Sequence, residues 1–226
     1  MPAGRFRPRE DGGGRPRGPG DSTSVSREGM TPAGPDRRRR DAMRKTIGMI
    51  LAELGRMLEN VPERTTERFV DLLLRSPRVF VTGQGRSGLM VKAFAQRLIQ
   101  IGFETHASEE ITTPAIARGD LLVVCSGTGE TPINILRARI AKRVGAIVVV
   151  ITARPRSTLA RMARLRITVG ARVGREASWH ATRSIQPIRS LFEQALLIYL
   201  DAVVLALMRR TRVGESRMAR RHANLD

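Results

Sequence analysis

The chain has 226 residues, with 40 Lys or Arg against 21 Asp or Glu, and its formal net charge is +19. At roughly 100–200 residues per domain, this length predicts one domain with appendages. A single Cys excludes an internal disulfide framework and a cysteine-built zinc or iron–sulfur site, and only three His remain for any other metal cluster. The composition therefore predicts a protein without a metal site.

The excess positive charge comes almost entirely from Arg and favours an anionic partner. Only three of the basic residues are Lys, namely Lys45, Lys92 and Lys142. Aromatic residues amount to 4% and do not alternate with basic ones, which argues against a stacking platform for single-stranded nucleic acid. We therefore expect a small phosphorylated ligand rather than nucleic acid, with solvated Arg-rich surfaces as the alternative interpretation.

The first part of the chain differs in composition from the rest. Residues 1–40 are rich in Gly, Pro, Arg and Ser, and we expect a disordered basic tail, because such a segment buries too little apolar surface to offset its ordering entropy. The folded domain is expected to span residues 41–226. It begins with a helix whose apolar residues share one face, namely Met43, Ile47, Ile50, Leu51, Leu54 and Leu58.

Helix and strand patterns then alternate along the chain. A helix over residues 62–75 precedes expected strands at 79–82, 103–107, 121–125, 146–151 and 165–169. The intervening helices are expected at 87–101, at 132–144 between Thr131 and Gly145, and after the N-cap Ser157. A last long helix is expected from about Ser184 to about Arg210. This order predicts an α/β fold with one doubly wound, five-stranded parallel sheet, whose ligands bind beyond the carboxyl ends of the strands.

The longest apolar run, residues 195–208, carries Asp201 in its middle. A charge at the centre of a membrane span costs about 2.5–3.5 kcal/mol even on the most lenient scale. We therefore interpret the run as a core or interface helix and expect no membrane partner.

A glycine-rich turn follows the first expected strand and reads Gly83-Gln84-Gly85-Arg86-Ser87-Gly88, which matches the pattern G-x-G-x-x-G. The glycines let backbone N–H groups approach a phosphate, and the N-terminus of the following helix favours negative charge. We expect Ser87, with the backbone amides of Gly85 and Gly88, to contact a sugar or its phosphate, and Arg86 to add charge at the mouth of the site.

A second, hydroxyl-rich turn follows the third expected strand and reads Ser126-Gly127-Thr128-Gly129-Glu130-Thr131. Hydroxyl and amide donors at a helix N-terminus form an anion cradle without a metal. We expect Ser126, Gly127, Thr128 and Thr131 to hold the phosphate of a monoester, while the first turn lies along the sugar.

Other interpretations of these turns stay open. The first turn also fits a tight turn without a ligand, or a dinucleotide site whose acid would be Glu109 or Glu110. Thr131 can also be interpreted as a plain helix N-cap. Glu130 is better explained as a favourable charge at a helix start than as a catalytic residue.

The two turns resemble those of the sugar isomerase (SIS) domain family, and the resemblance covers residues 41–226. The segments Ser184–Gln194 and Arg221–Leu225, together with Thr112-Thr113-Pro114 after Glu110, are similar to the family's 6-phospho-3-hexuloisomerases. Three positions depart from the family pattern. Glu109 and Arg189 stand where members often carry Gly, and Arg164 stands where an Ala-Asp pair is usual.

The resemblance implies an isomerase that interconverts D-arabino-hex-3-ulose 6-phosphate and fructose 6-phosphate, the formaldehyde-assimilating chemistry of the ribulose monophosphate pathway. The carbonyl moves between C3 and C2 through an enediol(ate), which requires a base and a hold on the phosphate but no cofactor. The resemblance also implies a cytoplasmic dimer or tetramer with sites shared between chains. A non-catalytic phosphosugar-binding module, an isomerase of a different phosphosugar and a nicotinamide enzyme remain the alternatives.

Two residues are expected to transfer protons. Glu193 lies near the start of the last helix among apolar residues, and burial suits a carboxylate to exchange a proton near neutral pH. The alternative is a structural ion pair with a nearby Arg. His222 is expected to be the acid/base partner, acting on a neighbouring subunit from a flexible tail. The alternative is a tail His without function.

The remaining reactive side chains are expected to be structural or solvated. His106 lies on the second expected strand and is interpreted as packed or at the surface, and His180 lies in a loop. Cys125 ends a buried strand without a neighbour that would activate its thiol, so we expect a small core residue.

Overall fold

In the computed structural model, which describes residues 35–170 and 184–224, five parallel strands form one sheet in the order β2-β1-β3-β4-β5. The strands are β1 (Val79–Gly83), β2 (Thr105–Ala107), β3 (Leu121–Cys125), β4 (Ile147–Thr152) and β5 (Leu165–Thr168). Every residue of β1 and β3 is buried, because helices cover both faces of the sheet, and this explains their continuous apolar sequences. The predicted α/β fold with a five-stranded parallel sheet is confirmed.

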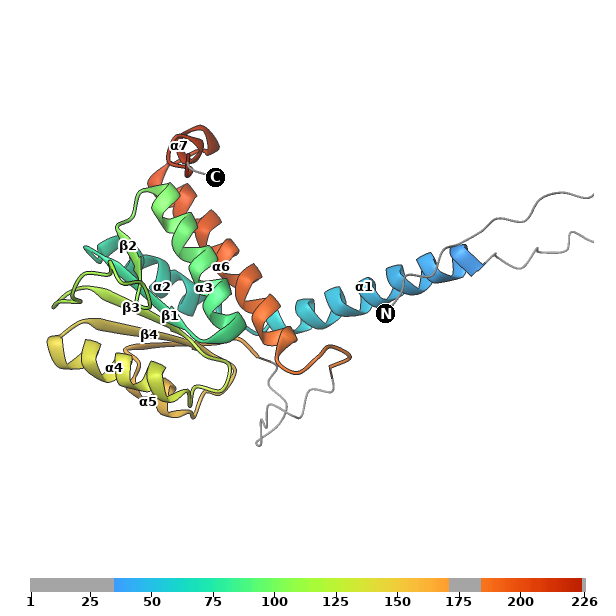
Figure 1. The fold of residues 1–226 in the computed structure, drawn as a ribbon, viewed down its shortest axis with the longest axis horizontal. Coiled ribbons are helices and arrows are strands. Elements are labelled where there is room, and N and C mark those ends of the chain that lie inside the picture. Colours follow the sequence, from blue (N-terminus) through green and yellow to red (C-terminus); the bar gives the residue numbers. More distant parts are fainter. Residues whose placement is uncertain (1–34, 171–183, 225–226) are drawn as a thin grey trace, which may run out of the picture.

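The helices form two layers, one on each face of the sheet (Figure 1). On one face, α3 (Gly85–Ile101) and α6 (Ser190–Thr211) lie side by side, and α2 (Glu63–Arg75) packs against α6 and β5. On the other face, α4 (Pro132–Val144) and the short α5 (Thr158–Met162) pack against β3 and β4. The larger hydrophobic core lies under the first layer and a smaller core lies under the second.

Local signals end and begin the helices as predicted. Gly102 follows α3 with φ 112° and Gly145 follows α4 with φ 86°, both in the left-handed region that favours glycine. Ser157 caps α5, because its Oγ accepts a hydrogen bond from the backbone N–H of Ala160 at 3.3 Å.

The first helix, α1 (Pro35–Leu58), starts before the expected position near Asp41, so the end of the predicted disordered tail is helical. The rest of that predicted tail lies outside the described residues. In Figure 1, α1 projects from the body of the domain. Met43 and Ile47 are 63% and 50% exposed, whereas Leu54 near the other end of the helix is buried. The second half of α1 therefore anchors the helix to the domain.

The helix α6 is long and apolar enough to cross a membrane by length and composition. Here it packs inside the domain, where Leu196, Leu200 and Leu207 are fully buried and the hydroxyl of Tyr199 lies 3.2 Å from that of Thr66 on α2. The expectation of a core helix is confirmed. Its start at Ser190, rather than near Ser184, is a correction, and the segment before it is engaged with α1 instead.

The C-terminal segment, which we expected to be flexible, packs on the end of α3. It contains the short helix α7 (Glu215–Ala219), and Met218 contacts the large core. Arg221 Nη1 donates a hydrogen bond to the carbonyl of Ile101 at 2.7 Å. The last carbonyls of a helix lack partners within it, so they accept such a cation readily.

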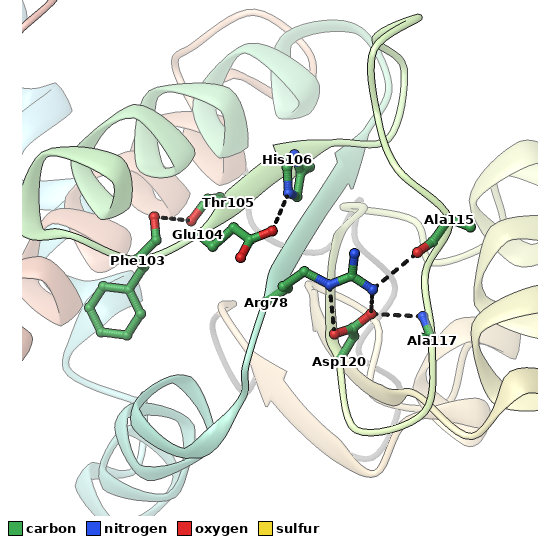
Figure 2. A network of polar contacts seen from close by, with 8 residues as sticks. All are labelled: Arg78, Phe103, Glu104, Thr105, His106, Ala115, Ala117 and Asp120. Carbon is green, nitrogen blue, oxygen red and sulfur yellow. Dashed lines mark hydrogen bonds and ion pairs between the residues drawn. The ribbon is translucent and has the colours of Figure 1, made fainter.

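An ion pair stabilises the sheet at the amino-terminal ends of β1 and β3 (Figure 2). Arg78 donates through Nε and Nη2 to the two carboxylate oxygens of Asp120, at 3.2 and 2.7 Å. Asp120 also accepts the backbone N–H of Ala117 at 2.7 Å, and Arg78 donates to the carbonyl of Ala115 at 3.1 Å. The carboxylate is 2% exposed, so these bonds satisfy a buried charge and fix the loop that leads into β3.

Candidate active site

The carboxyl ends of β1 and β3 mark the place where the chain changes from one face of the sheet to the other. After β1 the chain continues into α3, and after β3 it continues into α4 on the opposite face. Such a switch point leaves a crevice between the two connecting turns. A cavity of about 440 Å³ lies there, between the two turns and the start of α6.

This cavity brings together eight of the ten residues predicted for the site. Both turns and the last helix contribute to its lining, with Gly85, Arg86, Ser87, Ser126, Gly127, Thr128, Thr131 and Glu193. The other two, Gly88 and His222, are not among the residues that line it. The structure thus brings most of the predicted residues together, while the site itself and the roles assigned to its residues stay predictions.

The hydroxyls of the second turn lie close together at the start of α4. Ser126 Oγ is 3.1 Å from Thr131 Oγ1 and accepts the backbone N–H of Gly129, also at 3.1 Å. Thr131 occupies the N-cap position of α4, but its side chain makes no capping bond. Its hydroxyl therefore turns to Ser126 and the cavity, which favours the ligand interpretation over the plain N-cap.

Glycines bring the walls of the cavity together. Gly85 has φ 58°, in the left-handed region, at the point where the chain turns from β1 into α3. A Cβ on Gly88 would lie 2.7 Å from the carbonyl oxygen of Gly83, so this glycine allows α3 to approach β1. The N–H of Gly88 donates to the carbonyl of Gln84 within the turn, at 3.4 Å, so Gly88 has a packing role, and its contact with a ligand stays a prediction.

The electrostatics of the cavity favour an anion. Three helices, α3, α4 and α6, begin at its lining residues, and each helix N-terminus carries partial positive charge. Arg86 and Arg189 add full positive charges, against one carboxylate, that of Glu193. A phosphate end of a ligand is therefore the best match for the walls formed by these helix starts.

Glu193 lies in the first turn of α6 and is 6% exposed, as expected for the base. Its Oε2 accepts a hydrogen bond from Nε of Arg86, whose own side chain is 59% exposed at the mouth of the cavity. The ion pair that we kept as the alternative is thus present. The pair joins two lining residues of the cavity, and the catalytic role of Glu193 stays a prediction beside it.

His222 lies far from Glu193 within one chain. Glu193 is in the first turn of α6, whereas His222 follows the other end of that helix, beyond α7. At 1.5 Å per residue, the 22 residues of α6 span about 33 Å. His222 instead borders a separate cavity with Arg97 and Asp201. A catalytic role for His222 therefore requires a second chain.

Sequence reasoning missed several residues of the cavity. Asn134, in the first turn of α4, is fully buried, and its Nδ2 has no hydrogen-bond partner. Arg189 forms part of the wall in a left-handed conformation with φ 73°. Phe192 packs over Gly127, where a Cβ would lie 3.0 Å from the ring. Asn134 could have been suggested by its place three residues after Thr131 in the same helix start.

The remaining acids of this region are held by other groups. Glu109, a candidate acid for a dinucleotide, pairs with Arg137 Nη1 at 2.9 Å and accepts the hydroxyl of Thr82 at 3.0 Å. Glu130 accepts the backbone N–H of Thr158 at 2.8 Å, so it stabilises the start of α5. Hydrogen bonds to Thr158 lower the pKa of Glu130.

His106 and Cys125, which we expected to be structural, both pack within the domain, where His106 is half-buried. The ring of His106 lies 5.3 Å from that of Phe80, and its Nε2 is 3.2 Å from Glu104 (Figure 2). Cys125 is fully buried, and burial raises the pKa of its thiol. Arg164 is exposed. His180 lies outside the described residues.

Comparison with known proteins identifies the class to which this fold and cavity belong. The SIS domain model matches residues 72–198. The chain is 39% identical to the 3-hexulose-6-phosphate isomerase of Bacillus subtilis over 180 residues, which cover 80% of this chain and 97% of the relative. It is 34% identical to the enzyme of the same name from Mycobacterium gastri, over 82% of this chain and 92% of that one.

The solved structures agree with this assignment. A crystal structure from Methanococcus jannaschii superposes with a TM-score of 0.69 and 26% identity, over 80% of this chain and 99% of that one. Its description infers a molecular function of 3-hexulose-6-phosphate isomerase for that protein. The chain described here therefore belongs to the SIS domain family. Its named relatives are phosphosugar isomerases, so the dinucleotide interpretation of the first turn is not supported.

Proposed function

We propose that the protein interconverts D-arabino-hex-3-ulose 6-phosphate and fructose 6-phosphate without a cofactor. The observation that carries the proposal is the single cavity in which a hydroxyl-rich helix start, a glycine-rich turn and a buried carboxylate meet. The names of the relatives in Bacillus subtilis and Mycobacterium gastri support this choice of substrate.

The phosphate is proposed to bind at the start of α4. Ser126 and Thr131 offer hydroxyl donors there, and the dipole of the 13-residue helix favours the negative charge. The sugar then extends along the first turn, past Ser87, toward Glu193. This orientation places the end of the substrate that does not react in the anion cradle and the reacting carbons at the carboxylate.

Glu193 is proposed to take the proton from C2 of the hexulose, to exchange it with solvent, and then to deliver a proton to C3. The electron pair of the broken C2–H bond forms the C2–C3 double bond of an enediolate, and the negative charge moves to the oxygen on C3. Arg86 lies beside Glu193, where its guanidinium can stabilise that oxygen. A second proton moves from the oxygen on C2 to that on C3, so the reaction balances without an added reactant.

His222 is proposed to transfer this second proton from a neighbouring chain, because within its own chain it lies beyond the far end of α6. The exposed apolar residues of α1 and α6, such as Ile47 and Leu205, favour such self-association. Mixing inactive Glu193→Gln and His222→Ala chains is then expected to restore part of the activity, since some sites receive both intact residues. If His222→Ala is fully active alone, the shared site is wrong.

The proposed function is tested by turnover and binding together. The full-length protein is incubated with D-arabino-hex-3-ulose 6-phosphate, and fructose 6-phosphate is expected to form and to carry solvent deuterium at C3 when the reaction runs in D2O. Fructose 6-phosphate, but not NAD, is expected to raise the melting temperature. Protection without turnover would replace the isomerase by a phosphosugar-binding module, and the absence of both would reject the proposed site.

A further inference from the structure

The segment that leads into α6 is tied to α1 by one buried carboxylate. Glu53 Oε2 accepts hydrogen bonds from Ser184 Oγ at 2.7 Å and from Gln186 Nε2 at 3.0 Å. Its Oε1 accepts the backbone N–H of Ile185 at 3.0 Å. Three consecutive residues thus donate to one side chain that lies more than 130 positions earlier in the chain. We call this arrangement the Glu53 clasp.

The clasp holds a charge in a buried place. Glu53 is 8% exposed, on the face of α1 that turns toward the domain. Burial raises the pKa of its carboxyl, but the hydrogen bonds from Gln186, Ser184 and Ile185 and the charge of Arg56 outweigh this effect, and the pKa lies below its ordinary value. The clasp therefore stabilises the charged form of Glu53. The hydrogen bonds that Ser184 and Gln186 donate to it could not be predicted from the sequence.

The clasped segment continues directly into the wall of the active-site cavity. Ile188 and Arg189 line the cavity two and three residues after Gln186. Arg189 adopts its left-handed conformation there, and its carbonyl accepts the N–H of Glu193 at 3.2 Å. One short path of backbone thus connects the clasp, the cavity wall and the first turn of α6.

We propose that Glu53 is a positioning residue for the substrate: by fixing residues 184–186, its carboxylate sets the cavity wall formed by Ile188 and Arg189. The inference rests on the proposed function for the identity of the substrate. The helix α6 is held separately by its own core residues, such as Leu196 and Leu200. The clasp therefore governs how tightly the substrate is held more than how fast Glu193 transfers a proton.

The variant Glu53→Gln tests the clasp, because it keeps the size of the side chain but replaces one accepting oxygen by an NH2 group that faces donors. Glu59→Gln is the matched control, since it makes the same change at an exposed position just after α1. Ser184→Ala removes one of the three bonds to Glu53, together with the bond that Ser184 Oγ accepts from the N–H of Gln186 at 3.0 Å, and serves if Glu53→Gln fails to fold. Both test variants and the control are made in the full-length chain.

Hydrogen–deuterium exchange measures the clasp without reference to activity. The amides of Ile185, Gln186 and residues 188–190 are expected to exchange faster in Glu53→Gln than in the wild type, while those of β3 and β4 stay unchanged. Glu59→Gln is expected to match the wild type. Unchanged exchange at Ile185 in both Glu53→Gln and Ser184→Ala would overturn the clasp itself.

Kinetics then measure the positioning role. In Glu53→Gln, KM for the hexulose phosphate is expected to rise about tenfold and kcat to change less than about threefold, since ground-state and transition-state binding weaken together. Global damage would instead lower the active fraction, and thus kcat, at an unchanged KM. Faster exchange with an unchanged KM, or a loss confined to kcat, would overturn the inference. A wild type without turnover but with a normal clasp in the exchange experiment would reject the proposed function alone.

Discussion

Replacing Glu193 by Gln is expected to lower kcat by about 10²–10⁴-fold, because a positioned general base contributes a factor of this size. The amide has nearly the same shape as the carboxylate and still offers an oxygen to Arg86 Nε, so the contact across the cavity mouth can persist. What the variant loses is the ability to accept a proton. KM and the melting temperature are expected to stay close to those of the wild type.

Glu59→Gln provides the matched control for this experiment, because it makes the same change at an exposed position outside the cavity. Its loss of charge is expected to leave kcat within about twofold, as for surface substitutions in general. Steady-state rates of both variants, together with thermal unfolding curves, test whether Glu193 is the general base. A folded Glu193→Gln protein with a wild-type rate would remove Glu193 from the mechanism.

Removing the hydroxyls of the second turn is expected to abolish the grip on the phosphate. A hydrogen bond to a charged group contributes about 1.5–3 kcal/mol, so the double variant Ser126→Ala, Thr131→Val is expected to lose about 100-fold or more in kcat/KM. Thr131→Val is the cleaner single change, because Ser126 Oγ also accepts the N–H of Gly129 and its loss loosens the turn.

Thr131→Ser separates the hydroxyl from the rest of the side chain. It keeps the donor at the start of α4 and is expected to retain most of the kcat/KM that Thr131→Val loses. Isothermal titration with fructose 6-phosphate measures the same grip without catalysis. If Thr131→Val binds this ligand as tightly as Thr131→Ser does, the phosphate lies elsewhere and the assignment of the second turn is wrong.

The sheet could be predicted well because its signals are local. The runs at β3 and β4 are apolar without alternation, as buried parallel strands require, and Gly102 and Gly145 end helices in conformations that glycine favours. The two turns could be predicted for the same reason, because each directly follows a buried strand. Their convergence on one cavity then follows from parallel topology.

The errors arise where distant contacts override local pattern. The chain around Ser184 was expected to be helical, but its polar groups bond to Glu53, so α6 starts only at Ser190. The tail that carries His222 was expected to be flexible, but Arg221 donates a hydrogen bond to the carbonyl of Ile101 at the end of α3. The start of α1 was missed because an Arg-rich run next to Pro and Gly is typical of a tail. None of these contacts leaves a periodic trace in the sequence.

Arg189 shows how a departure from the family acquires a physical meaning. It precedes α6 with φ 73°, a conformation that costs a residue with a Cβ about 1–2 kcal/mol relative to glycine. A glycine, which the family resemblance led us to expect at this position, would adopt the conformation without that cost. Here the chain tolerates the strain and gains a cation in the wall of the cavity.

The convergence of three helix starts has a consequence for the pH profile of the enzyme. Peptide amides have no acid–base equilibrium in the physiological range, so the attraction that α3, α4 and α6 exert on an anion does not fade as the solution becomes more alkaline. A bell-shaped rate curve would accordingly report on the side chains that relay hydrogen and on the phosphate of the substrate, whose second pKa is about 6, while inorganic phosphate in a buffer would compete with the sugar at every pH at which the fold survives.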